Sequence, residues 1–132
     1  MKLDNIVSVS GLPGLYKMAG SRNNGLIIED LDSGKRRFAS VRKHQFTPLE
    51  SVSIYTMMDT TPLPDVFKNI MSADKESIPQ ANAASSEIQE WFSGVLPNYD
   101  ADRVLVSDMR KIIRWYNFLE SHDLLTGSDE EE

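Results

Sequence analysis

Side-chain periodicity changes once along this chain, near residue 60, and this change constrains the fold more than any other feature. Before it, short runs rich in β-branched and aromatic residues alternate with turn sequences, which is typical of strands. After it, apolar residues recur at positions i, i+3, i+4 and i+7, the spacing of an amphipathic helix. The sequence therefore predicts an α+β protein with a sheet in its first part and helices in its second.

Short strands separated by tight turns are predicted before the change. Asn24-Gly25 and Asp32-Ser33-Gly34 are typical turn sequences, because their residues tolerate positive φ. Closing such strands into a barrel hides both edges of the sheet. We therefore expect residues 1–60 to form a small five-stranded antiparallel β-barrel (Src-homology-3-like). Its expected strands are residues 6–9, 15–19, 26–31, 36–41 and 52–58.

About three α-helices are predicted after the change, and each has one apolar face that must be buried. The first follows Pro62 and Pro64, the second begins near Ser86, whose spacing to Gln89 is that of a capping box, and the third covers residues 107–121. We expect these helices, within residues 61–125, to dock on the barrel. Residues 74–84 are polar and alanine-rich and are expected to be a linker, and residues 126–132 an acidic disordered tail.

Composition excludes several classes of site. The 132 residues contain no cysteine, so disulfides, thiolate metal sites and cysteine nucleophiles are absent. The net charge of −6 combines eight cations and six anions in residues 1–60 with six cations and fourteen anions afterwards. Like-charge repulsion in this acidic second part argues against the whole protein lying on phosphate. No apolar run approaches the ~20 residues that span a bilayer, and we expect a cytoplasmic protein without membrane association.

Several short motifs carry a family resemblance. They include Ser10-Gly11-Leu12-Pro13-Gly14-Leu15-Tyr16-Lys17, Ser53-Ile54-Tyr55-Thr56 and Leu96-Pro97-Asn98-Tyr99-Asp100. Over roughly residues 3–121 the chain resembles an uncharacterised family of small bacterial proteins catalogued as a domain of unknown function. The resemblance implies a bacterial, cytosolic protein and carries no functional residue across. The acidic tail is not part of the pattern.

A basic cluster in the first part suggests one candidate site. Small barrels often contact nucleic acid through such cations. If Phe38 points inward, strand alternation places Arg36 on its side and Arg37 on the other, so the cations divide between two faces. RNA or DNA binding is therefore the alternative function, and a solvated turn and edge is the simpler reading. The cations of this cluster are Lys35, Arg36, Arg37, Arg42 and Lys43.

Catalytic and metal-binding patterns are weak. His44 and His122 are the only imidazoles, and neither has a second ligand at helical or turn spacing. The sequence from Asp100 lacks the glycine and glutamate that a calcium loop requires. Asp102 and Asp108 are better explained by helix starts or by pairing with nearby cations. We therefore expect no cofactor, no metal and no catalytic residue, and a small enzyme ranks third among the functions.

Aromatic residues near the last helix suggest the preferred function. Trp115 and Phe118 lie on the flank of that helix, rotated away from Met109, and Tyr99 lies in the preceding loop. Either these rings pack between the barrel and the helices, or they form a contact surface, since such residues are favoured interface anchors. We expect a non-catalytic protein-interaction module that binds a protein partner or itself through this region.

Overall fold

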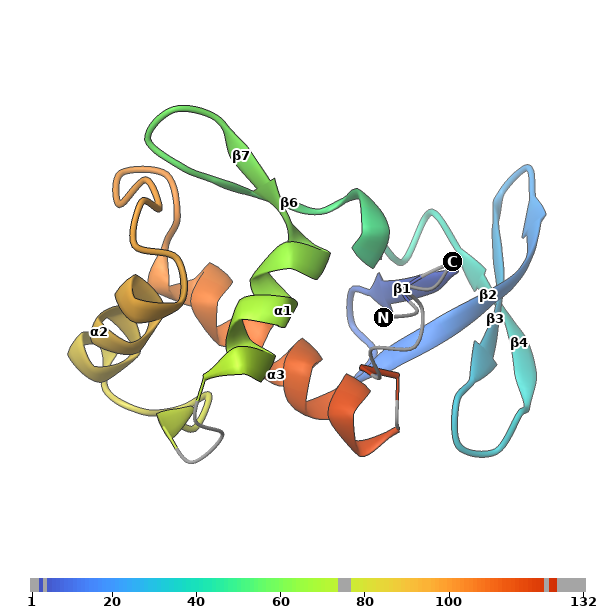
Figure 1. Ribbon diagram of the computed structural model, residues 1–132. Helices are drawn as coiled ribbons and strands as arrows, with labels where there is room; N and C mark the ends of the chain where they lie inside the picture. The colour runs from blue at the N-terminus through green and yellow to red at the C-terminus, as the bar shows by residue number, and fades with distance from the viewer. Residues whose placement is uncertain (1–2, 4, 74–76, 123, 126–132) are drawn as a thin grey trace, which may run out of the picture.

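The protein combines a curled sheet, a separate two-stranded hairpin and three helices (Figure 1). This computed structural model describes residues 3, 5–73, 77–122 and 124–125. The helices lie together on one side, the large sheet lies on the other, and the hairpin extends over the helices (Figure 1). The first residues of the expected linker, 74–76, and the expected tail, 126–132, lie outside the described residues.

The large sheet has five antiparallel strands in the order β4-β3-β2-β1-β5. The turn after β2 lies at residues 23–24, and the expected turn residue Gly25 instead begins β3 without a positive φ. The turn after β3 forms where the sequence predicts it, and its Gly34 has a φ of 73°. The register shifts between Met18 and Gly20, which places a bulge in β2 and bends the sheet. The strands are β1 (Ile6–Val9), β2 (Leu15–Arg22), β3 (Gly25–Asp30), β4 (Arg36–Ser40) and β5 (Phe46–Pro48).

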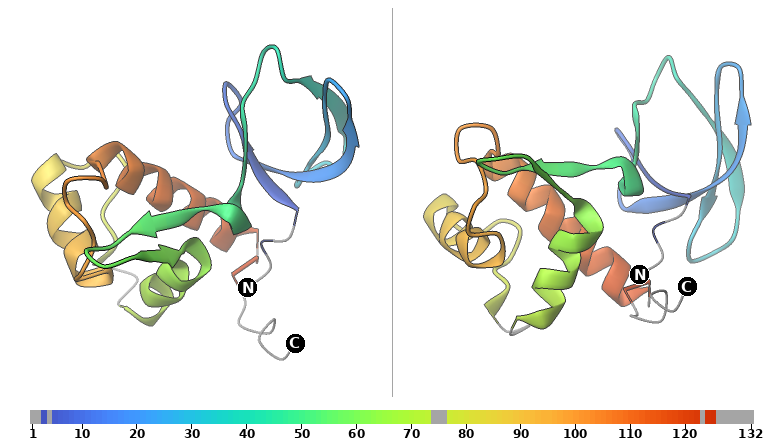
Figure 2. Two further views of the ribbon diagram at one scale, coloured as in Figure 1. Left: turned by 90° about the horizontal axis from the view of Figure 1, so that it is seen from above. Right: turned by 45° about the horizontal axis from the view of Figure 1, so that its top comes forward.

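The expected Src-homology-3-like barrel is wrong, although the α+β class is right. Figure 2 shows the sheet curling strongly, but its edge strands β4 and β5 do not pair with each other in the described residues, so the sheet stays open. The expected fifth strand leaves the sheet: β6 (Ser53–Tyr55) pairs with β7 (Thr60–Pro62) in a separate hairpin. Pro48 cannot donate to a ladder, and the 3-10 turn η1 (Leu49–Ser51) redirects the chain after β5.

The two faces of the large sheet contribute to different cores. The inner face of the curl buries Val7, Val9, Ile28 and Ala39 in a small cluster. The opposite face contributes Ile6 and Leu15 to the main core, which the helices complete. Alternation along each strand therefore separates a small interior of the sheet from the contact with the helices.

Three amphipathic helices form the rest of the main core. They are α1 (Leu63–Ser72), α2 (Ser85–Val95) and α3 (Val106–Ser121). The N-cap of α2 is Ala84, without a side-chain hydrogen bond, so the capping box expected at Ser86 does not form. Instead, the guanidinium of Arg110 on α3 donates to the carbonyl oxygens of Ala81 at 2.7 Å and Ala83 at 2.9 Å. These bonds hold the segment before α2 against α3.

Candidate functional site

A cleft of about 470 Å³ lies between the large sheet, the β6–β7 hairpin and the first half of α3. Its volume is within the range of ligand and peptide pockets. Three walls contribute side chains of different character: hydroxyls from the sheet, an aromatic ring from the hairpin, and charged and aromatic groups from α3. Because the walls come from distant parts of the sequence, the fold itself assembles the cleft.

The helical wall consists of residues spaced three or four positions apart. Asp108, Lys111, Ile112 and Trp115 line the cleft and therefore share one face of α3. The carboxylate of Asp108 accepts a 3.0 Å hydrogen bond from the backbone N–H of Leu105, which fixes the start of the helix. Trp115 is half-buried, so part of its ring surface is open to the cleft.

The hairpin wall presents Tyr55, whose side of β6 is open to solvent. The guanidinium of Arg103 lies over the Tyr55 ring, 5.0 Å from its centroid, in a cation–π arrangement. Arg103 also pairs with Asp100, with 3.6 Å between Nε and Oδ2. Both contacts hold a cation at the mouth of the cleft without burying it.

Backbone bonds fix the hairpin to the loop before α3. The N–H of Asp100 donates to the carbonyl of Tyr55, and the N–H of Met57 donates to the carbonyl of Asn98, both at 2.9 Å. Tyr99 forms a β-bridge with Thr56, and its ring packs edge-on against Phe92 at 5.1 Å. The expected partner-binding residue Tyr99 is thus half-buried and packs between the hairpin and α2.

Exposed apolar side chains gather at the tip of this hairpin and beside the cleft. Tyr55 is 47% exposed, Met57 68% and Met58 91%, and Leu105, just before α3, is 57% exposed. Single exposed apolar residues need no explanation, but three of these four lie within residues 55–58 of one hairpin. Methionine is common in surfaces that adapt to a partner, because its side chain is flexible and polarizable.

The sheet wall is polar and held by local bonds. Ser8, Ser10 and Thr47 bring hydroxyls to the cleft. The Ser10 hydroxyl accepts a 2.7 Å hydrogen bond from the backbone N–H of Gln45, and Nδ1 of His44 lies 2.7 Å from the Ser10 carbonyl oxygen. His44 therefore contacts the Ser10 backbone, and no hydrogen bond links its ring to the Ser10 hydroxyl in the described residues. These contacts do not have the geometry of an activated serine.

Phe118 lies at the interface between α3 and the large sheet. A Cβ on Gly14, in the turn between β1 and β2, would lie 2.7 Å from Cε2 of Phe118. The Phe118 ring also stacks on the imidazole of His122, with the centroids 4.2 Å apart. The sequence predicts that two aromatic residues of α3 bind a partner. Trp115 lines the cleft, whereas Phe118 is half-buried between α3 and the sheet.

His122, at the end of α3, makes an electrostatic contact with the turn after β3. Its Nε2 lies 2.7 Å from Oδ1 of Asp32, and its Nδ1 lies 2.8 Å from the Phe118 carbonyl oxygen. The bond to the Phe118 carbonyl, with a smaller contribution from Asp32, raises the pKa of His122 above its ordinary value. In the neighbouring turn, the backbone N–H groups of Ser33 and Asp32 bond the carboxylate of Asp30 and lower its pKa.

The basic cluster is divided by the fold. All five cations are exposed, but Ala39, not Phe38, points into the curl, so Arg37 lies on the inner face and Arg36 on the outer face. Arg36 pairs with Glu29 across the strands at 2.9 Å. Arg42 and Lys43 lie beyond the other end of β4 from Lys35. The cluster therefore forms no continuous basic stripe.

The remaining candidate acids serve local structure. Asp100 accepts a 2.9 Å bond from the N–H of Asp102 and pairs with Arg103. Within the described residues, no three histidine or acidic side chains are grouped as a metal site would require. Among the helices described, none is both long and apolar enough to cross a membrane.

Comparisons with known proteins now identify the family. A family model described as Domain of unknown function (DUF6852) matches residues 52–119, from β6 through α3. The chain belongs to this family. A second model, Domain of unknown function (DUF5606), matches residues 3–49, the large sheet. The two matches meet at η1, where the chain leaves the sheet, and the expected resemblance to an uncharacterised family is confirmed.

A solved structure has the same fold. A solution NMR structure of a protein from Bacteroides vulgatus, a target of the Northeast Structural Genomics Consortium, is 35% identical in sequence and superposes with a TM-score of 0.73. The match covers 93% of this chain and 89% of that one. A comparison with curated proteins gives no match.

Proposed function

We propose that the protein is a non-catalytic protein-interaction module whose docking surface is the cleft between α3 and the β6–β7 hairpin. The observation that carries the proposal is that Trp115 and Tyr55 line one cleft, beside the exposed Met57 and Met58. Aromatic residues and methionine are enriched in the centres of protein interfaces. A partner would cover apolar surface that is otherwise in contact with water.

The rigidity of the walls supports docking. Trp115 projects from a helix of sixteen residues, and backbone bonds on both sides of the hairpin hold Tyr55. A backbone held in this way loses little conformational entropy when a partner binds. The exposed Met57 and Met58 at the tip of the hairpin add flexible contacts at the rim.

Protein binding is favoured over nucleic-acid binding, the alternative, by the distribution of charge. The cations Lys35, Arg36 and Arg37 lie at one end of β4, and Arg42 and Lys43 lie beyond the other. Arg36 is also partly neutralised by Glu29. Affinity for a phosphate backbone depends on several cations acting together along it, and this arrangement does not provide such a row.

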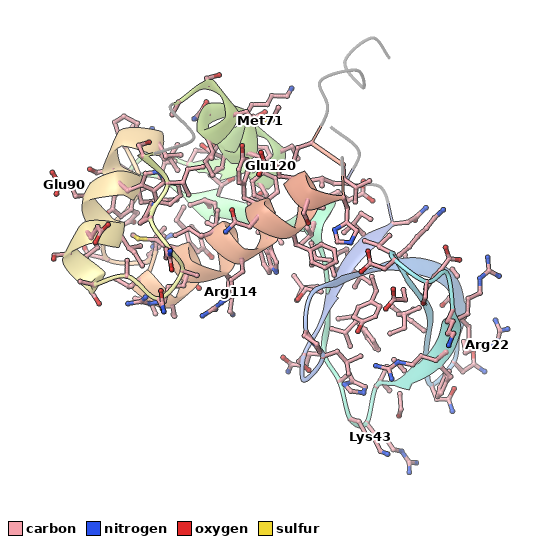
Figure 3. The ribbon with its side chains drawn as sticks, turned by 90° about the horizontal axis from the view of Figure 1, so that it is seen from below. Arg22, Lys43, Met71, Glu90, Arg114 and Glu120 are labelled. Carbon is pink, nitrogen blue, oxygen red and sulfur yellow. The ribbon has the colours of Figure 1, made fainter. Side chains whose placement is uncertain are left out.

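Site-specific photo-crosslinking tests the proposal. A photoreactive residue replaces Met57, two positions after the cleft residue Tyr55, or, as the control, Glu90 on the outer side of α2 (Figure 3). We expect a discrete protein adduct from position 57 in cells that express the protein natively, and none from position 90. The adduct must disappear when Trp115→Ala is added to a chain that still folds. Adducts of equal yield at both positions, an adduct with nucleic acid, or none at all would contradict the proposal.

A further inference from the structure

We infer that the cleft binds an extended, acidic peptide segment of a partner protein. This inference rests on the proposed function and adds the chemistry of the partner. It is carried by the charges on the walls, the edge strand beside the cleft, and the two aromatic rings that line it.

Two cations, Arg103 and Lys111, line the cleft within an acidic part of the chain. After residue 60 the sequence has six cations and fourteen anions, and four of the six cations lie within residues 103–114. These four are Arg103, Arg110, Lys111 and Arg114. Residues 103–114 thus hold four cations and one anion, Asp108, although Asp100 and Asp102 lie just before them.

The structure distinguishes cations used for folding from those available to a ligand. Arg110 is committed to the segment before α2, through the carbonyls of Ala81 and Ala83. Lys111 lines the cleft and is exposed, and neither it nor Arg114 forms an ion pair with another described residue. Figure 3 shows Arg114 projecting from α3 on the side away from Glu120.

Opposing charge at the cleft is limited. Asp108 lines the same wall, but its carboxylate is bonded to the N–H of Leu105 and is half-buried. Asp100 offsets part of the charge of Arg103. Lys111 and Arg103 are both exposed at the cleft, where carboxylates of a ligand would form charge-assisted hydrogen bonds with them.

The sheet wall favours an extended ligand. Thr47 lies on β5, an edge strand that pairs only with β1 among the described strands, and it lines the cleft with Ser8 and Ser53. An edge strand can accept hydrogen bonds from an added extended segment. Each cation of the cleft lies beside an aromatic ring: Lys111 is one helical turn from Trp115, and Arg103 lies over Tyr55. A segment with neighbouring acidic and apolar side chains would therefore contact both.

A short acidic peptide fits this surface better than a polynucleotide. The cleft itself has only two lining cations, Arg103 and Lys111, and the net charge of the chain is −6, which repels a long polyanion. A peptide with a few carboxylates can contact Arg103 and Lys111 without extending beyond the cleft.

Fluorescence of Trp115 gives a direct test. The chain has two tryptophans, and Trp91→Phe leaves Trp115 as the only reporter. The buried Trp91 indole N–H has no hydrogen-bond partner in the described residues, so this background loses no such bond. The probe is a synthetic glutamate-rich peptide with a central leucine, compared with its glutamine counterpart. Anisotropy of the labelled peptide is recorded in parallel, so binding is detected even if Trp115 fluorescence does not change.

We expect saturable binding of the glutamate peptide that weakens with salt, and about tenfold weaker binding of the glutamine peptide, equivalent to ~1.4 kcal/mol. Lys111→Gln with Arg103→Gln should reduce affinity for the glutamate peptide by a similar factor. The matched pair Arg36→Gln with Arg42→Gln, on β4 and in the turn after it, should leave this affinity unchanged.

Three results would overturn the inference. The first is equal affinity for both peptides, and the second is an equal loss of affinity from Arg36→Gln with Arg42→Gln. The third is tighter binding of a uridine RNA oligonucleotide, if Lys111→Gln with Arg103→Gln weakens that binding. If the peptides fail while position 57 still crosslinks a protein, only the acidic partner is refuted and the docking function stands. If both experiments fail, the docking function is refuted as well.

Discussion

Gly14 determines how closely the ring of Phe118 approaches the turn between β1 and β2. Its φ of 74° and the 2.7 Å separation between a built Cβ and the ring are two independent reasons for glycine at this position. In the sequence, Gly14 stands out only as part of a family motif, and Phe118 is a candidate interface residue. Only the fold brings positions 14 and 118 together, because no periodicity relates them.

Gly14→Ala tests this contact. A non-glycine residue in the left-handed region costs roughly 1–2 kcal/mol, and the clash with the Phe118 ring should add to that cost. Gly34→Ala is the matched control, since Gly34 has a φ of 73° but nothing within 4 Å of a built Cβ. Denaturant unfolding should show a larger loss for Gly14→Ala, and Phe118→Leu should recover part of the difference. Equal losses at the two glycines would refute the contact.

The contact between His122 and Asp32 predicts that the stability of the protein depends on pH. The pKa of His122 is raised above 6.5 in the folded protein, so its contribution to stability is complete below that pH. It is lost as the pH rises through the raised folded-state pKa. Thermal unfolding from about pH 5 to about pH 9 should show a decline in the wild type that is absent in His122→Gln and smaller in Asp32→Asn. A decline of the same size in all three proteins would contradict this assignment.

At the scale of elements, the helices follow from sequence more directly than the strands. The apolar stripe after Pro62 predicts α1, because a 3.6-residue period can be recognised within a single segment without knowledge of its partners. Strand pairing depends on distant partners, and residues 52–58 alternate well enough to suit either sheet. The strand β5 has only three residues and ends at Pro48, so alternation of polar and apolar residues is too short there to predict a strand.

The β6–β7 hairpin should tolerate changes at its tip and not at its base. Ile54 is buried in the main core, so Ile54→Ala should cost about 2–5 kcal/mol of unfolding free energy. Met58 is exposed, and Met58→Ala should change stability by no more than about 0.5 kcal/mol. Thermal or denaturant unfolding of both variants measures the difference. A large loss for Met58→Ala would mean that the hairpin tip is part of the core, and the proposed surface would then be wrong.

At the scale of the whole molecule, the candidate cleft shows where sequence reasoning ends. The side chains of Lys111 and Trp115 are one helical turn apart, and their shared face could be predicted. The pairing of that face with Thr47 and Tyr55 could not, because it requires the hairpin to leave the sheet and pack near α3. The same departure explains why a closed barrel was the wrong expectation. Residues that would have completed the barrel form one wall of the cleft.

Mapping of backbone and indole NMR signals during titration with the glutamate-rich peptide tests docking at this cleft most directly. The account predicts that the largest shifts occur at Tyr55, Lys111 and the indole N–H of Trp115, while Arg37 and the indole of Trp91 stay unchanged. Shifts concentrated on β4 and the turns at its two ends, with the cleft residues unmoved, would contradict it.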